Sequence, residues 1–237
     1  MAKHKIPRFY FSLRSPYSWL LHRELTTRLP DVAEAVEWVP FCEPDAKTTQ
    51  MLAEYGGEYV VGEMTRAKNM YILQDIGRLA KARGLDMTWP VDRDSVWEVP
   101  HLGYLVAEAK GRGRAYIAAC YQARFLEGRD ICDPKVVGEI GASLGIDPDL
   151  VAGAVDDPGL RAEGTRLLAQ AGEDGVFGVP FFVHGFTRFW GLDRLDDFAA
   201  YLRGKGVTVT AATTPQPHNG AVRLGPSIDD GHAGGCG

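Results

Sequence analysis

The fold is decided by residues 9–21, which read FYFSLRSPYSWLL. The aromatic run Phe9–Phe11 favours a strand, and apolar residues recur at helical spacing from Tyr17 to Arg28. Proline is favoured in the first turn of a helix because its missing N–H would be unpaired there, and serine is a good N-cap. Ser15 and Pro16 therefore predict a strand, a turn and a helix, in that order.

Ser15 is predicted to lie at the positive end of this helix, where free backbone N–H groups favour an anion. The tetrapeptide Ser15-Pro16-Tyr17-Ser18 has the layout of a thioredoxin-type Cys-x-x-Cys with serine at both cysteine positions. A serine hydroxyl cannot form or exchange a disulfide. The stretch therefore indicates a site that binds a thiolate supplied from outside. Alternatively, Ser15 only caps the helix.

The composition is that of a globular chain, since 237 residues with 45% hydrophobic content can bury a large core. The net charge of −5 and the lack of a basic run argue against nucleic acid as a partner and favour small molecules or proteins. No stretch has the length of a signal peptide or a membrane span, so we expect a cytoplasmic protein. The spacing of cysteine and histidine predicts no metal site, and the cysteines are expected to be free thiols.

The rest of the chain predicts a strand at Val36–Phe41, parallel to the first in a β-α-β unit. Helical spacing then continues from Asp45 to Ala171. The predicted helices cover residues 65–83, 99–110, 112–126, 134–144, 148–155 and 158–171. Strands at 181–183 and 187–190 form a hairpin with its turn at 184–186, and a last helix covers 192–202.

This order predicts an α/β protein with a thioredoxin-like fold, in which a large all-helical domain is inserted between the β-α-β and β-β-α halves. The thioredoxin-like domain comprises residues 7–44 and 172–205, and the helical insertion comprises 45–171. The tail, residues 206–237, is rich in threonine, proline and glycine, and we predict it to be disordered.

A family resemblance rests on the run GVFGVPFFVHGFTRFWGLDRLDDF at residues 175–198. It resembles the C-terminal signature of the 2-hydroxychromene-2-carboxylate isomerases and kappa-class glutathione transferases, relatives of the DsbA oxidoreductases. Four further stretches agree in order: residues 9–21, 68–85 (KNMYILQDIGRLAKARGL), 121–133 (YQARFLEGRDICD) and 145–147. The similarity extends from residue 8 to residue 203.

The resemblance implies a glutathione site. Pro180 is then a cis-proline that faces the active-site helix, and Val179 before it pairs through its backbone with the cysteinyl part of glutathione. The sulfur lies next to Ser15, while Leu192 and Asp193 meet the γ-glutamyl group. Without the resemblance, Pro180 is a turn proline and Asp193 an N-cap.

Two features depart from the family pattern. The loop after the second strand reads FCEPDAKTTQ (residues 41–50) and lacks the glycine and asparagine that are common there, and Arg14 places a cation directly before the serine. The thiol is therefore either glutathione or another low-molecular-weight thiol. The predicted substrate pocket comprises Arg14, Pro16, Tyr17, Cys42, Tyr71 and Trp89. Trp38, Trp97 and Trp190 are further aromatic candidates for lining the pocket. Alternatively, Cys42 is a core residue, Arg14 points to solvent, and most of these aromatic residues are packing residues.

The leading functional hypothesis is a thiol-dependent cis/trans isomerase that acts on a conjugated unsaturated carbonyl or polyene compound. The substrate is a small molecule, free or attached to a carrier. One alternative is a kappa-like glutathione transferase, and another is a non-catalytic binding protein with a thioredoxin fold. A dithiol oxidoreductase is disfavoured because no cysteine pair occupies the helix start. By analogy with the relatives, a homodimer is expected.

Overall fold

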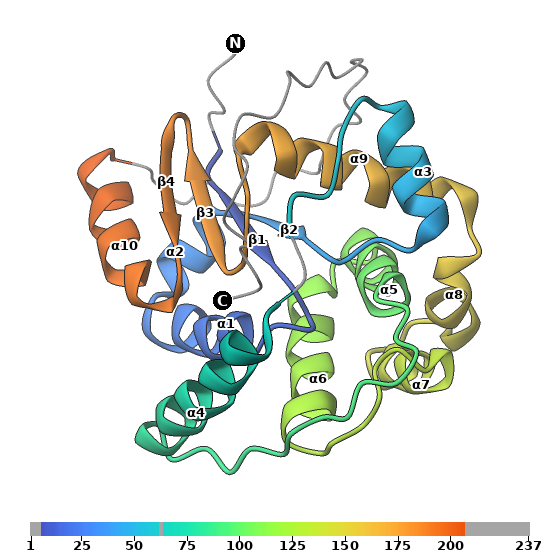
Figure 1. The fold of residues 1–237 in the computed structure, drawn as a ribbon, viewed down its shortest axis with the longest axis horizontal. Coiled ribbons are helices and arrows are strands. Elements are labelled where there is room, and N and C mark those ends of the chain that lie inside the picture. The colour runs from blue at the N-terminus through green and yellow to red at the C-terminus, as the bar shows by residue number, and fades with distance from the viewer. Residues whose placement is uncertain (1–5, 62–63, 207–237) are drawn as a thin grey trace.

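A four-stranded mixed sheet with helices on both faces forms the centre of the molecule (Figure 1). The structure, a computed structural model, describes residues 6–61 and 64–206. The strands are β1 (Arg8–Phe11), β2 (Glu37–Pro40), β3 (Phe181–His184) and β4 (Thr187–Trp190), in the order β2-β1-β3-β4. β1 runs parallel to β2 and antiparallel to β3, and β4 is antiparallel to β3. The predicted α/β class, the parallel pairing of the first two strands and the hairpin of the last two are confirmed, while the predicted tail lies outside the described residues apart from Gly206.

The helices follow most of the predicted positions, with ends shifted by one to three residues. They are α1 (Pro16–Arg28), α2 (Pro30–Ala35), α3 (Ala46–Glu54), α4 (Arg66–Ala82), α5 (Glu98–Ala109), α6 (Gly113–Phe125), α7 (Pro134–Ser143), α8 (Pro148–Ala152), α9 (Pro158–Asp174) and α10 (Leu195–Gly204). Short 3₁₀ turns, η1 (Gly153–Val155) and η2 (Leu192–Arg194), replace the last turn of one predicted helix and the first turn of another. None of these helices is long and apolar enough to cross a membrane, within the described residues.

Two helices, α2 and α3, were not predicted. α2 has six residues and its N-cap, Leu29, makes no side-chain hydrogen bond. α3 buries only Thr48 and Leu52, which is too few apolar positions for a periodic pattern. A capping signal was nevertheless present, because the Asp45 carboxylate accepts a hydrogen bond from the Thr48 N–H at 2.7 Å.

The two faces of the sheet are covered by different helices. Tyr10 and Phe181 point to one face, where they pack with residues of α3 and α9. Phe9, Phe11 and Phe182 alternate with them and point to the other face, toward α1, α2 and α10. Each fully buried large side chain contributes about 1.5–3 kcal/mol, so both faces are strongly held.

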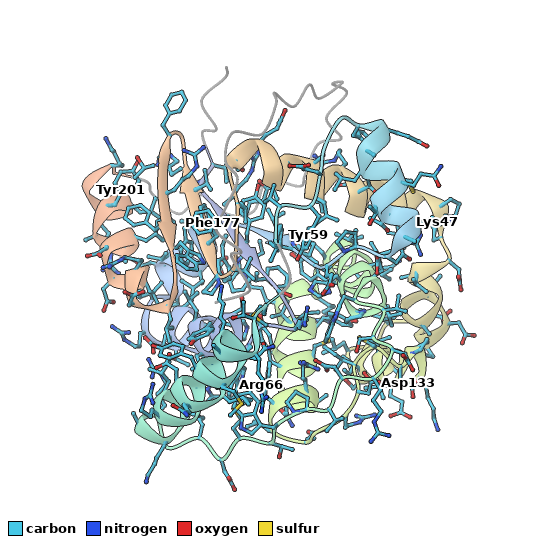
Figure 2. All side chains as sticks on the ribbon, in the orientation of Figure 1. Lys47, Tyr59, Arg66, Asp133, Phe177 and Tyr201 are labelled. Atoms are coloured by element: carbon cyan, nitrogen blue, oxygen red, sulfur yellow. The ribbon has the colours of Figure 1, made fainter. Side chains whose placement is uncertain are left out.

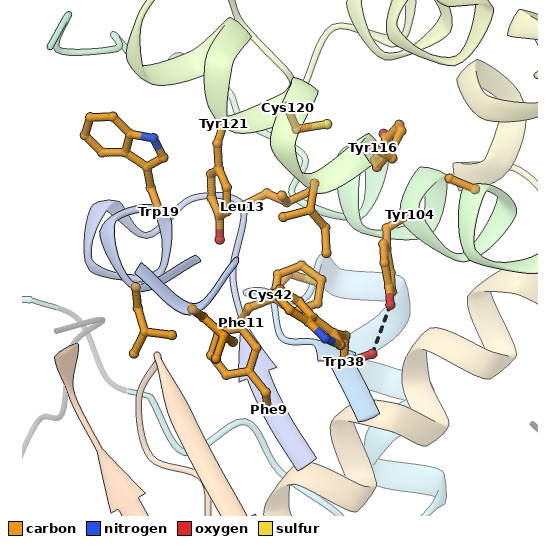
Figure 3. Packing of buried hydrophobic residues seen from close by; sticks show 14 of the residues in the cluster. Phe9, Phe11, Leu13, Trp19, Trp38, Cys42, Tyr104, Tyr116, Cys120 and Tyr121 are labelled. Atoms are coloured by element: carbon orange, nitrogen blue, oxygen red, sulfur yellow. Dashed lines mark hydrogen bonds between the residues drawn. The ribbon is translucent and has the colours of Figure 1, made fainter. Parts of the chain in front are cut away.

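The helical segment between β2 and β3 shares a core with the sheet (Figure 3). The Tyr104 hydroxyl of α5 donates a hydrogen bond to the Trp38 carbonyl of β2 at 3.0 Å. Trp19 of α1 stacks on Phe125 of α6 with ring centroids 5.0 Å apart. One cluster of buried apolar residues therefore runs from the sheet into α5, α6 and α7 without a break. The domain boundaries given above stay a prediction.

A buried polar network fastens α9 to β1. The Asp174 carboxylate accepts hydrogen bonds from the Arg8 guanidinium at 2.9 Å and from the Tyr10 hydroxyl at 2.5 Å. All three residues are buried. Because buried charges are costly unless they are paired, this network fixes where α9 ends before the chain enters β3.

Candidate functional site

Four connections meet at one end of the sheet. β1 and β2 are parallel, so residues 12–15 and 41–45 leave from the same end, where the Phe41 N–H donates to the Phe11 carbonyl at 2.8 Å. β3 is antiparallel to β1, so residues 177–180 arrive at that end. The Gly191 N–H donates to the Pro180 carbonyl at 3.0 Å, which adds residues 191–193. This end carries Ser15, Cys42, Val179 and Asp193, so the fold brings together residues that are far apart in the sequence.

Ser15 caps α1, as the sequence predicts. Its backbone is extended (φ −78°, ψ 121°) and its Oγ accepts a hydrogen bond from the Ser18 N–H at 3.2 Å. An oxygen that accepts in this way still has its own proton to donate. The residue is fully buried. A ligand therefore reaches the Ser15 hydroxyl only when neighbouring side chains move.

The loop before Ser15 is held by two helices of the insertion. The Leu13 N–H donates to Nε2 of His101 on α5 at 3.0 Å, and the Tyr121 hydroxyl of α6 donates to the Ser12 carbonyl at 3.0 Å. Since Nε2 accepts, Nδ1 carries the proton and donates to the Trp97 carbonyl at 2.7 Å. Burial lowers the pKa of His101 to about 4, so the ring is neutral. Sequence reasoning did not assign these contacts, because no local pattern joins residues so far apart.

The loop after β2 is held by the same helix α5. Glu98 Oε1 accepts a hydrogen bond from the Asp45 N–H at 2.5 Å, and Asp45 pairs with Arg161 of α9 at 2.8 Å. Burial raises the pKa of Glu98. Glu98 and His101 are three residues apart on α5, so one helical turn positions both loops.

The cysteines of the described segments are buried free thiols, as predicted. Cys42 lines a cavity of about 20 Å³ together with Glu98 and His101, which has room for a water molecule but is far too small for glutathione. Burial raises the pKa of Cys42 well above that of a free thiol, and raises the pKa values of Cys120 and Cys132 to about 12. These thiols are therefore poor nucleophiles. No group of three or more side chains suited to a metal ion occurs in the described part of the chain.

The residues that precede β3 and those that follow β4 differ in how far their side chains are exposed. The Val179–Pro180 peptide bond is cis, as predicted, and Val179 is fully buried. Leu192 opens η2, and the Asp193 side chain is 74% exposed, with Oδ2 3.4 Å from the Arg194 guanidinium. The Asp193 carboxylate is therefore accessible to a ligand from solvent. The ligand roles of these residues stay predictions.

The aromatic residues considered for the pocket occupy three kinds of position. Tyr71 on α4 and Trp89 on the α4–α5 connection are exposed and do not belong to the four connections. Tyr17 lies beside Ser15, and its hydroxyl donates to Asp75 Oδ2 of α4 at 2.8 Å. Trp38 and Trp97 are buried packing residues.

At the β3–β4 corner, the candidate Trp190 forms an aromatic pair with a residue that was not assigned to the site from the sequence. Phe177, labelled in Figure 2, makes an edge contact with Trp190, with ring centroids 5.0 Å apart. Both side chains are about two-fifths exposed, at 43% and 40%. The pair provides partly open aromatic surface next to the Val179–Pro180 turn.

Comparison with known proteins gives a consistent result. Residues 8–203 match the family described as DSBA-like thioredoxin domain. A 2-hydroxychromene-2-carboxylate isomerase from Sphingobium xenophagum is 29% identical over 202 residues, which cover 82% of this chain and 96% of the relative. The matches cover the described fold almost from end to end.

Solved structures show the same fold. A 2-hydroxychromene-2-carboxylate isomerase superposes with a TM-score of 0.66 at 22% identity, covering 85% of this chain and 96% of that one. The cytosolic disulfide reductase DsbM from Pseudomonas aeruginosa, solved with GSH, gives a TM-score of 0.54 at 20% identity and covers 84% and 98% of the two chains. At these identities the likeness concerns the fold alone.

Proposed function

Because the chain belongs to the DSBA-like thioredoxin domain family, we propose that it is a thiol-dependent cis/trans isomerase of a conjugated unsaturated carbonyl or polyene compound. The observation that carries the proposal is Ser15 at the N-cap of α1, where the thioredoxin-type layout has its reactive cysteine. Thiol exchange by this chain's own residues is disfavoured, because its described cysteines are buried and have raised pKa values. A thiol from solution therefore supplies the nucleophile.

Similarity to the isomerase from Sphingobium xenophagum supports the reaction type. The structural likeness to DsbM, which was solved with GSH, supports glutathione as the thiol. The Asp193 carboxylate, exposed beside η2, is suited to accept hydrogen bonds from the ammonium group of a γ-glutamyl moiety. Glutathione is therefore the thiol that we propose.

The mechanism is reversible addition. The thiolate attacks the carbon β to the carbonyl, a C–S bond forms, and the electron pair of the double bond moves to give an enolate. The former double bond is now single and rotates. Collapse of the enolate expels the thiolate and restores the double bond in the other geometry, so atoms and electrons balance and the thiol is regenerated.

Ser15 and α1 stabilise the nucleophile in this scheme. The Ser15 hydroxyl proton is directed to the sulfur while its oxygen still accepts from the Ser18 N–H. The positive end of the α1 dipole favours the thiolate over the thiol. Phe177 and Trp190 offer an aromatic surface for the unsaturated part of the substrate.

The test is turnover of 2-hydroxychromene-2-carboxylate and of a Z-configured α,β-unsaturated ketone, followed by chromatography of the isomers. We expect turnover with glutathione and none with S-methylglutathione, which has no thiol. Accumulation of a stable thioether would instead identify a kappa-like transferase. Glutathione binding without any turnover would identify a binding protein, and turnover that is equal with and without glutathione would refute thiol dependence.

A further inference from the structure

We propose that Arg14 recognises a ligand carboxylate at the start of α1, and that Glu43 occupies the position of this carboxylate in the free protein. The proposal rests on the proposed function, because it assigns a specificity-determining residue to the same site. The carboxylate belongs either to the conjugated substrate or to the glycyl end of glutathione.

Arg14 lies where an anion is already favoured. It directly precedes Ser15, the N-cap of α1, so its charge adds to the positive end of the helix dipole. Its own N–H donates to the Ser12 Oγ at 3.3 Å, within the loop that His101 and Tyr121 hold. The residue is therefore fixed at its backbone by the elements that position Ser15.

The Arg14 guanidinium is also oriented in advance. It lies over the ring of Trp97, 5.4 Å from the centroid, and Trp97 is buried. Arg124 lies over the same ring at 4.8 Å, but both ends of its fork are taken by Asp92 at 2.7 and 3.0 Å. Arg14 makes one side-chain hydrogen bond in the described part of the chain, to Glu43. Arg124 is also buried, whereas the Arg14 side chain is 33% exposed, so a ligand from solvent can reach the remaining donors of Arg14.

The Glu43 carboxylate is suited to be displaced from Arg14 by a ligand carboxylate. Its Oε2 lies 2.5 Å from Nη1 of Arg14, and the two side chains are 53% and 33% exposed. Such exposed ion pairs contribute little to stability, since solvent screens them, so a ligand carboxylate displaces Glu43 at small cost. Glu43 belongs to the loop FCEPDAKTTQ, so the contact joins the two features in which this sequence departs from the family pattern, Arg14 and the loop after β2.

The experiment compares an acid with its methyl ester, using the same Z-configured enone, in the wild type, Arg14→Gln, Glu43→Gln and the double variant. Loss of a charge-assisted hydrogen bond predicts that Arg14→Gln raises KM for the acid relative to the ester by roughly 10- to 100-fold. Glu43→Gln removes the competitor and should lower KM for the acid. Arg14→Lys should restore part of the preference for the acid. Arg203→Gln should leave the ratio unchanged, because Arg203 lies in the last turn of α10, 56% exposed and paired with Asp31.

The same variants distinguish the two sources of the carboxylate. If the substrate supplies the carboxylate, Arg14→Gln changes only the ratio of KM between the acid and its ester. If glutathione supplies it, Arg14→Gln weakens the binding of glutathione, but not of its glycyl ethyl ester, in calorimetry. The proposal is overturned if Arg14→Gln still prefers the acid to its methyl ester and glutathione to its glycyl ethyl ester as strongly as the wild type. It is also overturned if Glu43→Gln binds acids more weakly.

Binding also separates this proposal from the proposed function. If no enone is isomerised, the isomerase proposal fails, and calorimetry with cinnamate against methyl cinnamate, and with glutathione against its ethyl ester, still tests Arg14. A wild-type protein that binds neither carboxylate more tightly than its ester refutes the carboxylate site.

Discussion

The Leu13 N–H donates a hydrogen bond to Nε2 of His101, 3.0 Å away and 88 positions later in the chain. Through this contact a helix of the insertion fixes the loop that carries Ser15. The hydrogen bond needs an unprotonated Nε2, so the geometry of the loop depends on a neutral imidazole.

Protonation of His101 should therefore destabilise the folded protein in acid. Its pKa falls from the ordinary 6.5 to about 4 on folding because of burial, so the unfolded chain binds the proton more readily. The stability contributed by this shift is complete above pH 6.5 and is lost as the pH falls toward 4, by about 3 kcal/mol. Urea unfolding between pH 7 and 4.5 should be less pH-dependent in His101→Gln than in the wild type. Burial also lowers the pKa of His22 to about 4. His22→Gln should therefore reduce the pH dependence of the unfolding free energy by a second, independent amount. Equal pH dependence in all three proteins would contradict this.

Ser15→Ala should lower both stability and activity. Loss of the N-cap costs about 1 kcal/mol, measurable by urea unfolding. Loss of a hydrogen bond to the thiolate should reduce kcat/KM roughly 10- to 100-fold. Asp157→Ala is the matched control, because Asp157 caps α9 by accepting from the Leu160 N–H at 2.8 Å, away from the four connections. It should cost similar stability and leave turnover intact. Unchanged turnover in Ser15→Ala would make Ser15 purely structural.

Asp174→Asn should destabilise the fold strongly. The substitution removes the Asp174 charge from the buried Arg8 guanidinium, which keeps its ion pair with Glu37 at 3.0 Å, and it weakens the Tyr10 contact, a loss of roughly 1–3 kcal/mol. Asp31→Asn provides the comparison, since Asp31 pairs with Arg203 at the surface and should cost less than about 1 kcal/mol. Similar urea midpoints for the two variants would show that the buried network contributes little.

Two glycine substitutions should have opposite effects on the stability of the protein. Gly175 ends α9 with φ +73°, a left-handed conformation that costs other residues about 1–2 kcal/mol, so Gly175→Ala should lower the melting temperature. Gly77 lies inside α4, where an added Cβ meets nothing within 4 Å. Gly77→Ala should therefore raise stability by up to about 1 kcal/mol. Calorimetric melting of both variants tests the pair, and a stabilised Gly175→Ala would contradict the backbone argument.

Local sequence patterns were sufficient to predict most of the helices and strands and their order along the chain. Asp-Pro pairs marked the starts of α7, α8 and α9, and the aromatic run before Ser15 marked β1. The family resemblance, and not any periodicity, gave the cis geometry before Pro180. What could not be predicted depends on contacts distant in sequence. The neutral tautomer of His101 and the pairing of Arg14 with Glu43 exist only after α5 and the loop after β2 have packed against β1.

The unbroken apolar cluster between the sheet and α5–α7 has a consequence for how the molecule folds and evolves. A helical segment that completes the core of the sheet cannot melt by itself, since its removal would expose Phe11 and Trp38 to water. We therefore expect one cooperative unfolding transition for both parts, and no stable fragment from either. Selection for a new substrate can alter the exposed loops freely, but any change in the packing of these helices also alters the packing of the strands beneath them.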